Sequence, residues 1–194
     1  METKAKTNKR ILNTRAAIDD AFKEMIASTS ANAISVQDLT LKAGIHRKTF
    51  YSHYASIEDL YDHTLAQIIK GFIDQIDEQL ALVDLRHQTR IFFDYFSSQE
   101  PYVEKIICDS SYRDYCTVMF ARSIDHNTSY KTKISAIPEK SQGIVSAYLV
   151  GATLEIYRQW VKENKQLSLE EITAQAITLI FGGYDGYVKT QLEN

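Results

Sequence analysis

Apolar residues recur at intervals of three and four along most of this 194-residue chain, which is the spacing of one face of an α-helix. Ile11, Ile18, Phe22 and Met25 follow this spacing and predict a first helix over about residues 9–28. The chain has only seven Gly and two Pro, a composition that argues against an all-β or loop-rich fold. The pattern therefore predicts an all-α protein.

The segment 35–60 predicts two short helices joined by a glycine turn and followed at once by a third helix. Ser35 and Asp38 have the Ser-x-x-acid spacing of a capping box, which begins the first of these helices. Gly44 stands where the chain needs a positive φ to leave that helix, and residues 46–53 then form the second. Two short helices with such a turn are a helix-turn-helix.

The second short helix has an inner and an outer face. Phe50 and Tyr54 are expected to point inward. The residues expected to point outward are Arg47, Lys48, Thr49 and Ser52.

Further helices are expected along the rest of the chain. Ser56 with Asp59 is a second capping box and opens a helix over about residues 56–80, which links two domains. The other expected helices span about residues 86–97, start at Pro101 and at Ser110, and cover about 138–163 and 168–192, while residues 125–137 are expected to form a loop.

Charge is unevenly distributed along the chain, although the formal net charge is only −3. Residues 1–54 hold nine Lys and Arg against five Asp and Glu, a net charge of +4, and residues 55–194 hold thirteen against twenty, a net charge of −7. A surface that faces phosphates favours positive charge, because binding releases counterions from the nucleic acid. The basic end is also the helix-turn-helix end, although a split of this size also occurs by chance in soluble proteins.

The segment from Gly44 to Leu60 resembles the DNA-binding module of the tetracycline-repressor (TetR) family of transcriptional regulators. The family pattern stands here as Gly44-Ile45, His46 to Lys48, Thr49-Phe50-Tyr51, His53-Tyr54, Ser56, Glu58 and Leu60. His46 and Lys48 occupy positions where the family usually has small residues. Ile57 replaces a lysine that tends to contact a DNA phosphate, so one expected DNA contact is missing.

The resemblance implies an all-α regulator with a helix-turn-helix DNA-binding domain in residues 1–54 and a helical effector-binding and dimerisation domain in residues 55–194. It further implies a homodimer that binds a palindromic operator in double-stranded DNA and acts as a repressor released by a small-molecule effector. The alternative is a TetR-like coactivator or interaction protein that no longer binds DNA, which the missing lysine at position 57 leaves open.

The helix-turn-helix supplies the candidate DNA contacts. Arg47 and Lys48 lie near the exposed start of the recognition helix and are expected to reach base edges in the major groove. Thr49 can reach a thymine methyl or a phosphate. The residues suited to the phosphate backbone are Ser35, Gln37, Tyr51 and His53. The full candidate set is Ser35, Gln37, His46, Arg47, Lys48, Thr49, Tyr51, Ser52 and His53.

The last two predicted helices carry more apolar surface than one small domain can cover. They resemble the C-terminal helix pair of TetR-type regulators, which forms a four-helix bundle between two subunits. The candidate dimer-interface residues are Ile144, Gly151, Trp160, Ile180, Gly183 and Tyr187. The alternative is that both helices complete an intramolecular core.

Aromatic residues are frequent between positions 92 and 120, where they form either plain core or the wall of a small-molecule pocket. The TetR resemblance places Phe96, Tyr112, Tyr115, Met119 and Tyr148 around a shared cavity. The effector expected there is a largely apolar or aromatic molecule of drug-like size, not a sugar phosphate or a metal ion.

The sequence offers little support for an enzyme. It has no glycine-rich phosphate loop, no GxSxG and no HExxH, and its five histidines lack metal-ligand spacing, so no metal and no cofactor are expected. Cys108 and Cys116 lack CxxC spacing and are expected to be reduced core residues. No segment has the apolar length of a signal peptide or a membrane span, so the protein is expected to be cytoplasmic.

Overall fold

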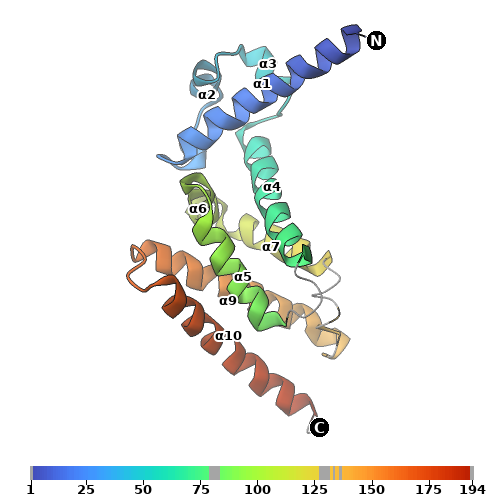
Figure 1. Ribbon diagram of the computed structural model, residues 1–194, viewed down its shortest axis with the longest axis vertical. Coiled ribbons are helices and arrows are strands. Elements are labelled where there is room, and N and C mark those ends of the chain that lie inside the picture. Colours follow the sequence, from blue (N-terminus) through green and yellow to red (C-terminus); the bar gives the residue numbers. More distant parts are fainter. Residues whose placement is uncertain (1, 79–83, 127–131, 133, 136, 193–194) are drawn as a thin grey trace. The chain divides into compact units, whose positions relative to one another are not determined.

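The structure is a computed structural model that describes residues 2–78, 84–126, 132, 134–135 and 137–192. Every regular element within these residues is helical, which confirms the predicted all-α class (Figure 1). The α-helices are α1 (Glu2–Ile26), α2 (Val36–Lys42), α3 (Arg47–Tyr51), α4 (Ile57–Glu78), α5 (Leu85–Ser98), α6 (Pro101–Cys108), α7 (Arg113–His126), α9 (Glu139–Lys162) and α10 (Leu169–Leu192). The 3-10 helices η1 (Ala31–Ala33) and η2 (Ser110–Tyr112) precede α2 and α7.

Most observed helix ends lie within a few residues of the predicted ones. α1 is longer than predicted and begins at Glu2, and α3 is shorter than the predicted span 46–53. The predicted loop 125–137 lies mostly outside the described residues, and its first two residues, Asp125 and His126, are the last two of α7.

The chain divides into two compact units. The first contains Met1–Gln67 and Glu100–Ser111, and the second contains Ile68–Gln99 and Tyr112–Asn194. This division assigns α6 and the first half of α4 to the helix-turn-helix unit, whereas the sequence suggested a single boundary after residue 54. α6 therefore packs with the N-terminal helices, although α5 and α7 flank it in the sequence.

The first unit is built around large apolar side chains from α1, α2 and α3. Phe22, Leu39 and Phe50 have no exposed surface. α6 joins this core through Ile106, which is also fully buried and whose carbonyl accepts a hydrogen bond from the Tyr61 hydroxyl at 2.8 Å. Burial of these side chains stabilises α2, α3 and α6, which are too short to persist alone in water.

The helix ends are set by local chemistry. Gly44 has φ +65°, which confirms the predicted left-handed turn between α2 and α3. Ser168 and Glu171 form a complete capping box, with Ser168 N–H donating to Glu171 Oε2 (2.8 Å) and Glu171 N–H donating to Ser168 Oγ (3.3 Å). At the start of α2, Asp38 N–H donates to Ser35 Oγ at 3.1 Å. The Asp side chain is shorter than that of Glu, and the Asp38 carboxylate accepts a hydrogen bond from the Ser35 hydroxyl at 2.6 Å rather than from the Ser35 backbone N–H.

A polar network joins α1, the residues after α3, and α4 within the first unit. The Tyr54 hydroxyl donates to Asp19 Oδ1 (2.7 Å) and accepts from Arg15 Nε (3.1 Å). Arg15 Nη2 lies 2.6 Å from His63 Nε2, and Gln67 Nε2 lies 2.8 Å from the same His63 nitrogen. Burial, together with the hydrogen bond to Asp19, raises the pKa of Tyr54 to about 12, so the hydroxyl stays protonated and keeps both bonds.

Asp109 ties η1 to the end of α6. Its carboxylate accepts hydrogen bonds from Ala31 N–H, from the Ser30 hydroxyl and from Ser111 N–H, each at 2.9 Å. Burial by itself would raise the pKa of Asp109, but the bonds from Ala31, Ser111 and Ser30 outweigh it, and the pKa lies below its ordinary value. The ionised carboxylate therefore stabilises the fold.

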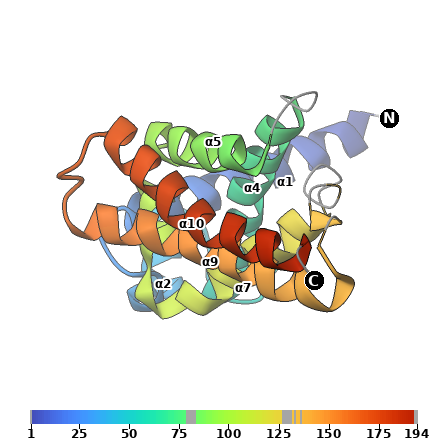
Figure 2. The ribbon, with the colours of Figure 1, turned by 90° about the horizontal axis from the view of Figure 1, so that it is seen from below.

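The second unit is a helical bundle of α5, α7, α9, α10 and the second half of α4. α10 packs against both α5 and α9, and α7 packs against α9 (Figure 2). Its core is a cluster of aromatic rings, in which Phe92 lies 4.6 Å from Phe96, 5.6 Å from Phe72 and 5.6 Å from Tyr157, centroid to centroid. Such spacings are typical of favourable edge-to-face and offset packing.

Both cysteines are free thiols, as predicted. Cys116 is buried on α7, and Cys108 is half-buried at the end of α6. Burial raises the pKa of the Cys116 thiol to about 11, which keeps it protonated and unreactive near neutral pH.

Replacing Asp109 tests the tie between η1 and α6. Asp109→Ala is expected to lower the free energy of unfolding by about 1 kcal/mol at pH 7. This value is modest because Asp109 is only half-buried and solvent weakens its interactions. Because the folded-state pKa lies below the unfolded one, this stabilisation exists above the unfolded pKa and is lost as pH falls through the folded pKa. Urea unfolding should therefore separate the variant from the parent at pH 7, and this separation should shrink as the pH is lowered through the folded-state pKa. Asp114→Ala, an exposed carboxylate on α7, is the control, and equal losses for both variants would contradict the prediction.

Removing the Tyr54 hydroxyl tests the network. Tyr54→Phe leaves Asp19 and Arg15 without their shared partner and should lower the free energy of unfolding by about 1–2 kcal/mol in urea. Tyr51→Phe is the matched control, because Tyr51 is 50% exposed, and it should change stability by less than about 0.5 kcal/mol. If the two variants unfold at the same urea concentration, the network does not stabilise the unit.

Candidate nucleic-acid interface and cavity

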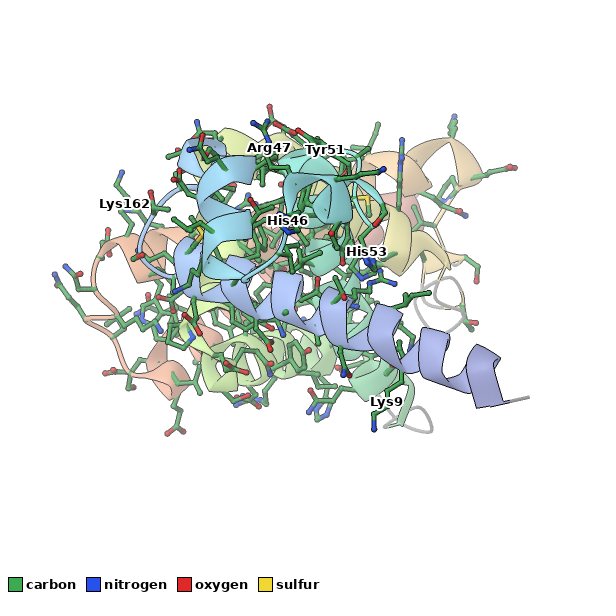
Figure 3. All side chains as sticks on the ribbon, turned by 90° about the horizontal axis from the view of Figure 1, so that it is seen from above. Lys9, His46, Arg47, Tyr51, His53 and Lys162 are labelled. Atoms are coloured by element: carbon green, nitrogen blue, oxygen red, sulfur yellow. The ribbon has the colours of Figure 1, made fainter. Side chains whose placement is uncertain are left out.

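α3 presents a polar surface because its apolar side is anchored in the first unit. Phe50 is fully buried, and Tyr54 is 3% exposed with its ring 6.0 Å from that of Phe50. The predicted inward orientation of both rings is confirmed. Figure 3 looks onto this end of the first unit and labels Arg47 and Tyr51, which lie one helical turn apart on α3.

The nine candidate DNA contacts all have accessible surface. Thr49 and His53 are half-buried, and the other seven are exposed: Ser35, Gln37, His46, Arg47, Lys48, Tyr51 and Ser52. The predicted outward orientation of Arg47, Lys48 and Ser52 is therefore confirmed, while their contact with DNA stays a prediction.

Two of the candidate hydroxyls already have partners within the chain. The Ser35 hydroxyl bonds with Asp38 as the cap of α2, and the Ser52 hydroxyl donates to Thr49 O at 2.6 Å. Gln37, exposed in the first turn of α2, is therefore better placed than Ser35 to offer a side chain to a phosphate.

Position 57, where the family pattern has a lysine, holds a buried residue. Ile57 is 7% exposed at the first position of α4 and belongs to the core of the first unit. Its side chain cannot replace the missing phosphate contact, and the start of α4 lacks a side-chain cation at this position.

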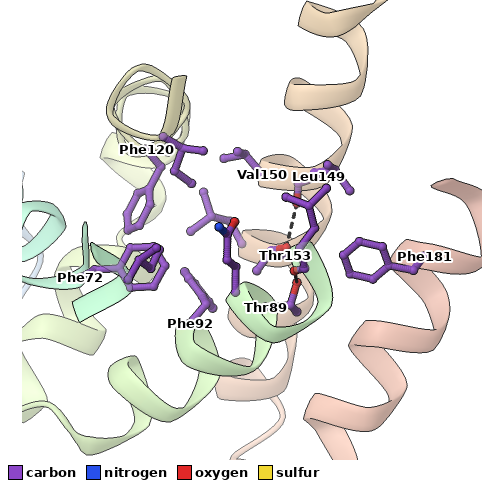
Figure 4. Close-up of a pocket in the computed structure, with 13 residues that line it drawn as sticks. Phe72, Thr89, Phe92, Phe120, Leu149, Val150, Thr153 and Phe181 are labelled. Atoms are coloured by element: carbon purple, nitrogen blue, oxygen red, sulfur yellow. Dashed lines mark hydrogen bonds between the residues drawn. The ribbon is translucent and has the colours of Figure 1, made fainter. Parts of the chain in front are cut away.

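A small cavity lies in the second unit among α4, α5, α7, α9 and α10 (Figure 4). It holds about 50 Å³ of space accessible to the centre of a water molecule. Its apolar wall includes Phe72, Phe92, Phe120, Leu149, Val150 and Phe181. None of its thirteen lining residues carries an ionisable side chain.

The five residues predicted to surround an effector do not line this cavity. Phe96 is buried in the aromatic cluster behind the wall. Tyr148 is 42% exposed, and its hydroxyl donates to Ile180 O of α10 at 3.0 Å. Tyr112, Tyr115 and Met119 are half-buried in η2 and α7. An effector role for these side chains therefore stays a prediction that the cavity does not support.

The polar residues that line the cavity are not among the predicted site residues. Thr89 and Thr153 donate their hydroxyls to Leu85 O (3.2 Å) and Leu149 O (2.8 Å) one turn back in their own helices. Gln88 is 9% exposed, and its Nε2 has no hydrogen-bond partner in the described part of the chain. The sequence feature that could have indicated them is the presence of Gln88 and Thr89 among the apolar residues of the predicted helix 86–97.

The six dimer candidates fall into different environments. Ile144 is 74% exposed, Gly183 is exposed, and Gly151 is half-buried. Trp160 and Ile180 are buried by their own chain, as the intramolecular alternative expected for both helices. The remaining candidate side chain, that of Tyr187, lies outside the part of the chain whose side chains are described.

The exposed surface of the α9 and α10 pair includes a group of small and apolar residues. Its members are Gly143, Ile144, Ala147, Tyr148, Leu179, Gly182, Gly183 and Gly186, and we call this set the α9–α10 face. Gly183 lets Tyr148 reach the α10 backbone, since a Cβ at position 183 would lie 2.8 Å from the Tyr148 hydroxyl oxygen.

Two other kinds of site find no support in the described residues. No described helix is both long enough and apolar enough to cross a bilayer. Within the same residues, no three His, Cys, Asp or Glu side chains come together in a way that could hold a metal ion.

Comparisons with known proteins bear on these observations. No protein-family model matches the sequence. The chain is 24% identical over 196 residues to MftR of Mycobacterium tuberculosis, a transcriptional regulator assigned to mycofactocin biosynthesis, and the match covers 95% of this chain and 98% of the relative. It is 22% identical to DhaS of Lactococcus lactis, a helix-turn-helix activator of the dhaKLM operon, over 89% of this chain and 91% of the relative.

The fold can be compared directly with a solved structure. A TetR transcriptional regulator from Streptococcus agalactiae superimposes with a TM-score of 0.70 at 19% identity, covering 90% of this chain and 97% of that one. The chain therefore has the fold of a TetR-type regulator, and it is similar to transcriptional regulators over nearly its whole length.

Proposed function

We propose that the protein is a homodimer that binds a palindromic operator in double-stranded DNA and is released from it by a small-molecule effector. The observation that carries the proposal is the start of α3, where Arg47 and Lys48 are exposed on a helix whose other side is fixed by buried Phe50. A cationic helix end held rigidly at the surface suits the major groove, where Arg or Lys to guanine is the commonest specific contact.

The other exposed residues of the unit would set the position of the protein on the duplex. Tyr51, half-exposed on α3, and Gln37, in the first turn of α2, carry polar groups suited to phosphate oxygens. The net charge of +4 on residues 1–54 favours the same partner, because these cations displace counterions from DNA.

The α9–α10 face is the surface that we assign to the dimer. Ile144 and Leu179 are 74% and 64% exposed, although each belongs to a helix whose other side is buried. The glycines and the alanine of this face allow two helix pairs to approach closely, and the exposed aliphatic side chains supply apolar area for them to bury. A two-fold axis through the face would pair two recognition helices, as a palindromic operator requires.

Release by an effector rests on the cavity and on chain continuity. α4 has its first half in the helix-turn-helix unit and its second half in the unit that contains the cavity. α6 belongs to the first unit, while α5 and α7, joined to its two ends, line the cavity. A ligand that binds one arrangement of these helices better than another shifts the population, and with it the distance between recognition helices.

The sign of regulation is proposed as repression, since a bound dimer blocks other proteins from the DNA that it covers. DhaS, a relative, is an activator, so a reporter gene behind the selected operator decides the sign. The alternative is a coactivator or interaction protein that does not bind DNA, and the buried Ile57 in place of a phosphate-contacting lysine favours it.

DNA binding is tested by selecting duplexes from the source genome. The protein should enrich a palindrome, and the logarithm of its affinity should fall with the logarithm of salt concentration with a slope near −7, as expected for about eight phosphate contacts. Arg47→Ala should cost about 1–3 kcal/mol and relax the preference at one base pair of each half-site. Tyr51→Phe should instead weaken binding to all duplexes alike. If no genomic duplex binds better than a random one, the alternative without DNA binding is favoured.

The dimer is tested by placing a charge on the α9–α10 face. Ile144→Arg or Leu179→Arg would bury an unpaired cation in the interface, so the subunits should separate and the protein should sediment as a monomer at low micromolar concentration. Val118→Arg is the control, because Val118 is 46% exposed on α7, outside this face, and this variant should stay dimeric. Folded Ile144→Arg and Leu179→Arg proteins that remain dimers would place the interface elsewhere.

A further inference from the structure

The cavity of the second unit contains one polar group that its own packing does not explain. Gln88, on α5, is 9% exposed, and its side-chain Nε2 has no hydrogen-bond partner among the described residues. A buried amide N–H without an acceptor is unfavourable, and native proteins rarely keep one unless it has another use. Gln88 also lines the cavity, so a molecule that occupies and widens the cavity is the one that can reach this N–H.

The other polar side chains of the wall cannot take this role as readily. The hydroxyls of Thr89 and Thr153 donate to carbonyls one turn back in their own helices, so their hydrogens are already used. The remaining ten of the thirteen lining residues are apolar, with Phe92, Leu149 and Phe181 among them. Gln88 is thus the one lining residue of the described chain with an unused N–H.

The charge of the wall limits the ligand further. No lining residue is an acid or a base, so a carboxylate, phosphate or ammonium group inside the cavity would be desolvated without a counterion. Such a group would cost far more than the apolar contacts of the same ligand could return.

We infer that the cavity selects an uncharged, mostly apolar ligand that carries a hydrogen-bond acceptor, such as a carbonyl oxygen, and that Gln88 Nε2 donates to this acceptor. The inference rests on the proposed function, in which an effector acts through this unit, and it names the chemical class of that effector and the residue that selects it.

The size of the cavity links this ligand to regulation. The space of about 50 Å³ is about a third of the roughly 150 Å³ that admits benzene in an engineered protein cavity. A ligand whose ring is fully enclosed must therefore widen the wall, and occupancy selects a different helix arrangement. α5 leads directly into α6 of the helix-turn-helix unit, so its displacement is passed on through the chain.

The inference is tested with four probes of matched size on the full-length protein. Acetophenone carries an uncharged acceptor, ethylbenzene carries none, benzoate is an anion and benzylammonium is a cation. In calorimetric titrations, acetophenone should bind about two- to tenfold more tightly than ethylbenzene, the range that one net hydrogen bond supplies. Benzoate and benzylammonium should bind more weakly than ethylbenzene.

A matched pair of variants assigns the preference to one side chain. Gln88→Leu should abolish the preference for acetophenone over ethylbenzene while still binding ethylbenzene. Gln159→Leu, an exposed glutamine on α9, should keep the preference of the parent protein. The side-chain amide proton resonances of Gln88 in the 15N-labelled parent should also move further downfield with acetophenone, which accepts a hydrogen bond, than with ethylbenzene.

Several results would overturn the inference. They are equal affinities of the parent for acetophenone and ethylbenzene, tighter binding of either charged probe, no binding of any probe up to its solubility, or a preference that survives in Gln88→Leu. Operator binding is measured on the same protein without probes. If the operator is bound and the probe preference fails, only the ligand inference is lost, whereas failure to bind any genomic duplex overturns the proposed function itself.

Discussion

The candidate DNA-reading surface depends on the burial of one side chain. α3 is only five residues long, and an isolated helix of this length has no stability in water. It exists because Phe50 is fully enclosed and because the following Tyr54 is held by Asp19 and Arg15 of α1. These contacts fix the position of α3 and leave its polar face exposed, so the reach of Arg47 is set by apolar packing on the opposite side of the helix.

The elements of the helix-turn-helix could be predicted from the sequence because their causes are local. A serine cap, a glycine with positive φ and an apolar residue every three or four positions each act within one or two helical turns. The network of Arg15, Tyr54 and His63 could not be predicted from local pattern. Arg15 is separated along the chain from Tyr54 by 39 positions and from His63 by 48, so these residues meet only after the unit has folded. The family resemblance likewise marks Ile57 as the loss of a cation, but it does not indicate that this side chain is buried.

In the second unit, the sequence pattern predicts the helices but not the function of their buried residues. Helical periodicity indicates which side chains face inward, but it does not distinguish a well-packed core from the wall of a cavity, because both are apolar. The family resemblance places Phe96 at an effector site and Trp160 at a dimer interface, although the chain buries both side chains in its own core. The more informative exceptions were polar residues inside an apolar stripe, since a buried amide such as that of Gln88 needs a partner that apolar neighbours cannot provide.

In the proposed function, the continuity of the chain connects the cavity to the helix-turn-helix unit. α6 is part of the helix-turn-helix unit, where Tyr61 and Asp109 hold it by hydrogen bonds, yet the segments on either side of it belong to the other unit. A displacement of α5 or α7 must therefore move α6 or strain these bonds. The same connection works in the opposite direction, since any coupling between two binding equilibria is reciprocal. If the contacts of α3 with DNA fix α6, they also restrict how far α5 can move, and the widening of the cavity that a ring-sized ligand requires becomes less favourable on the operator than off it.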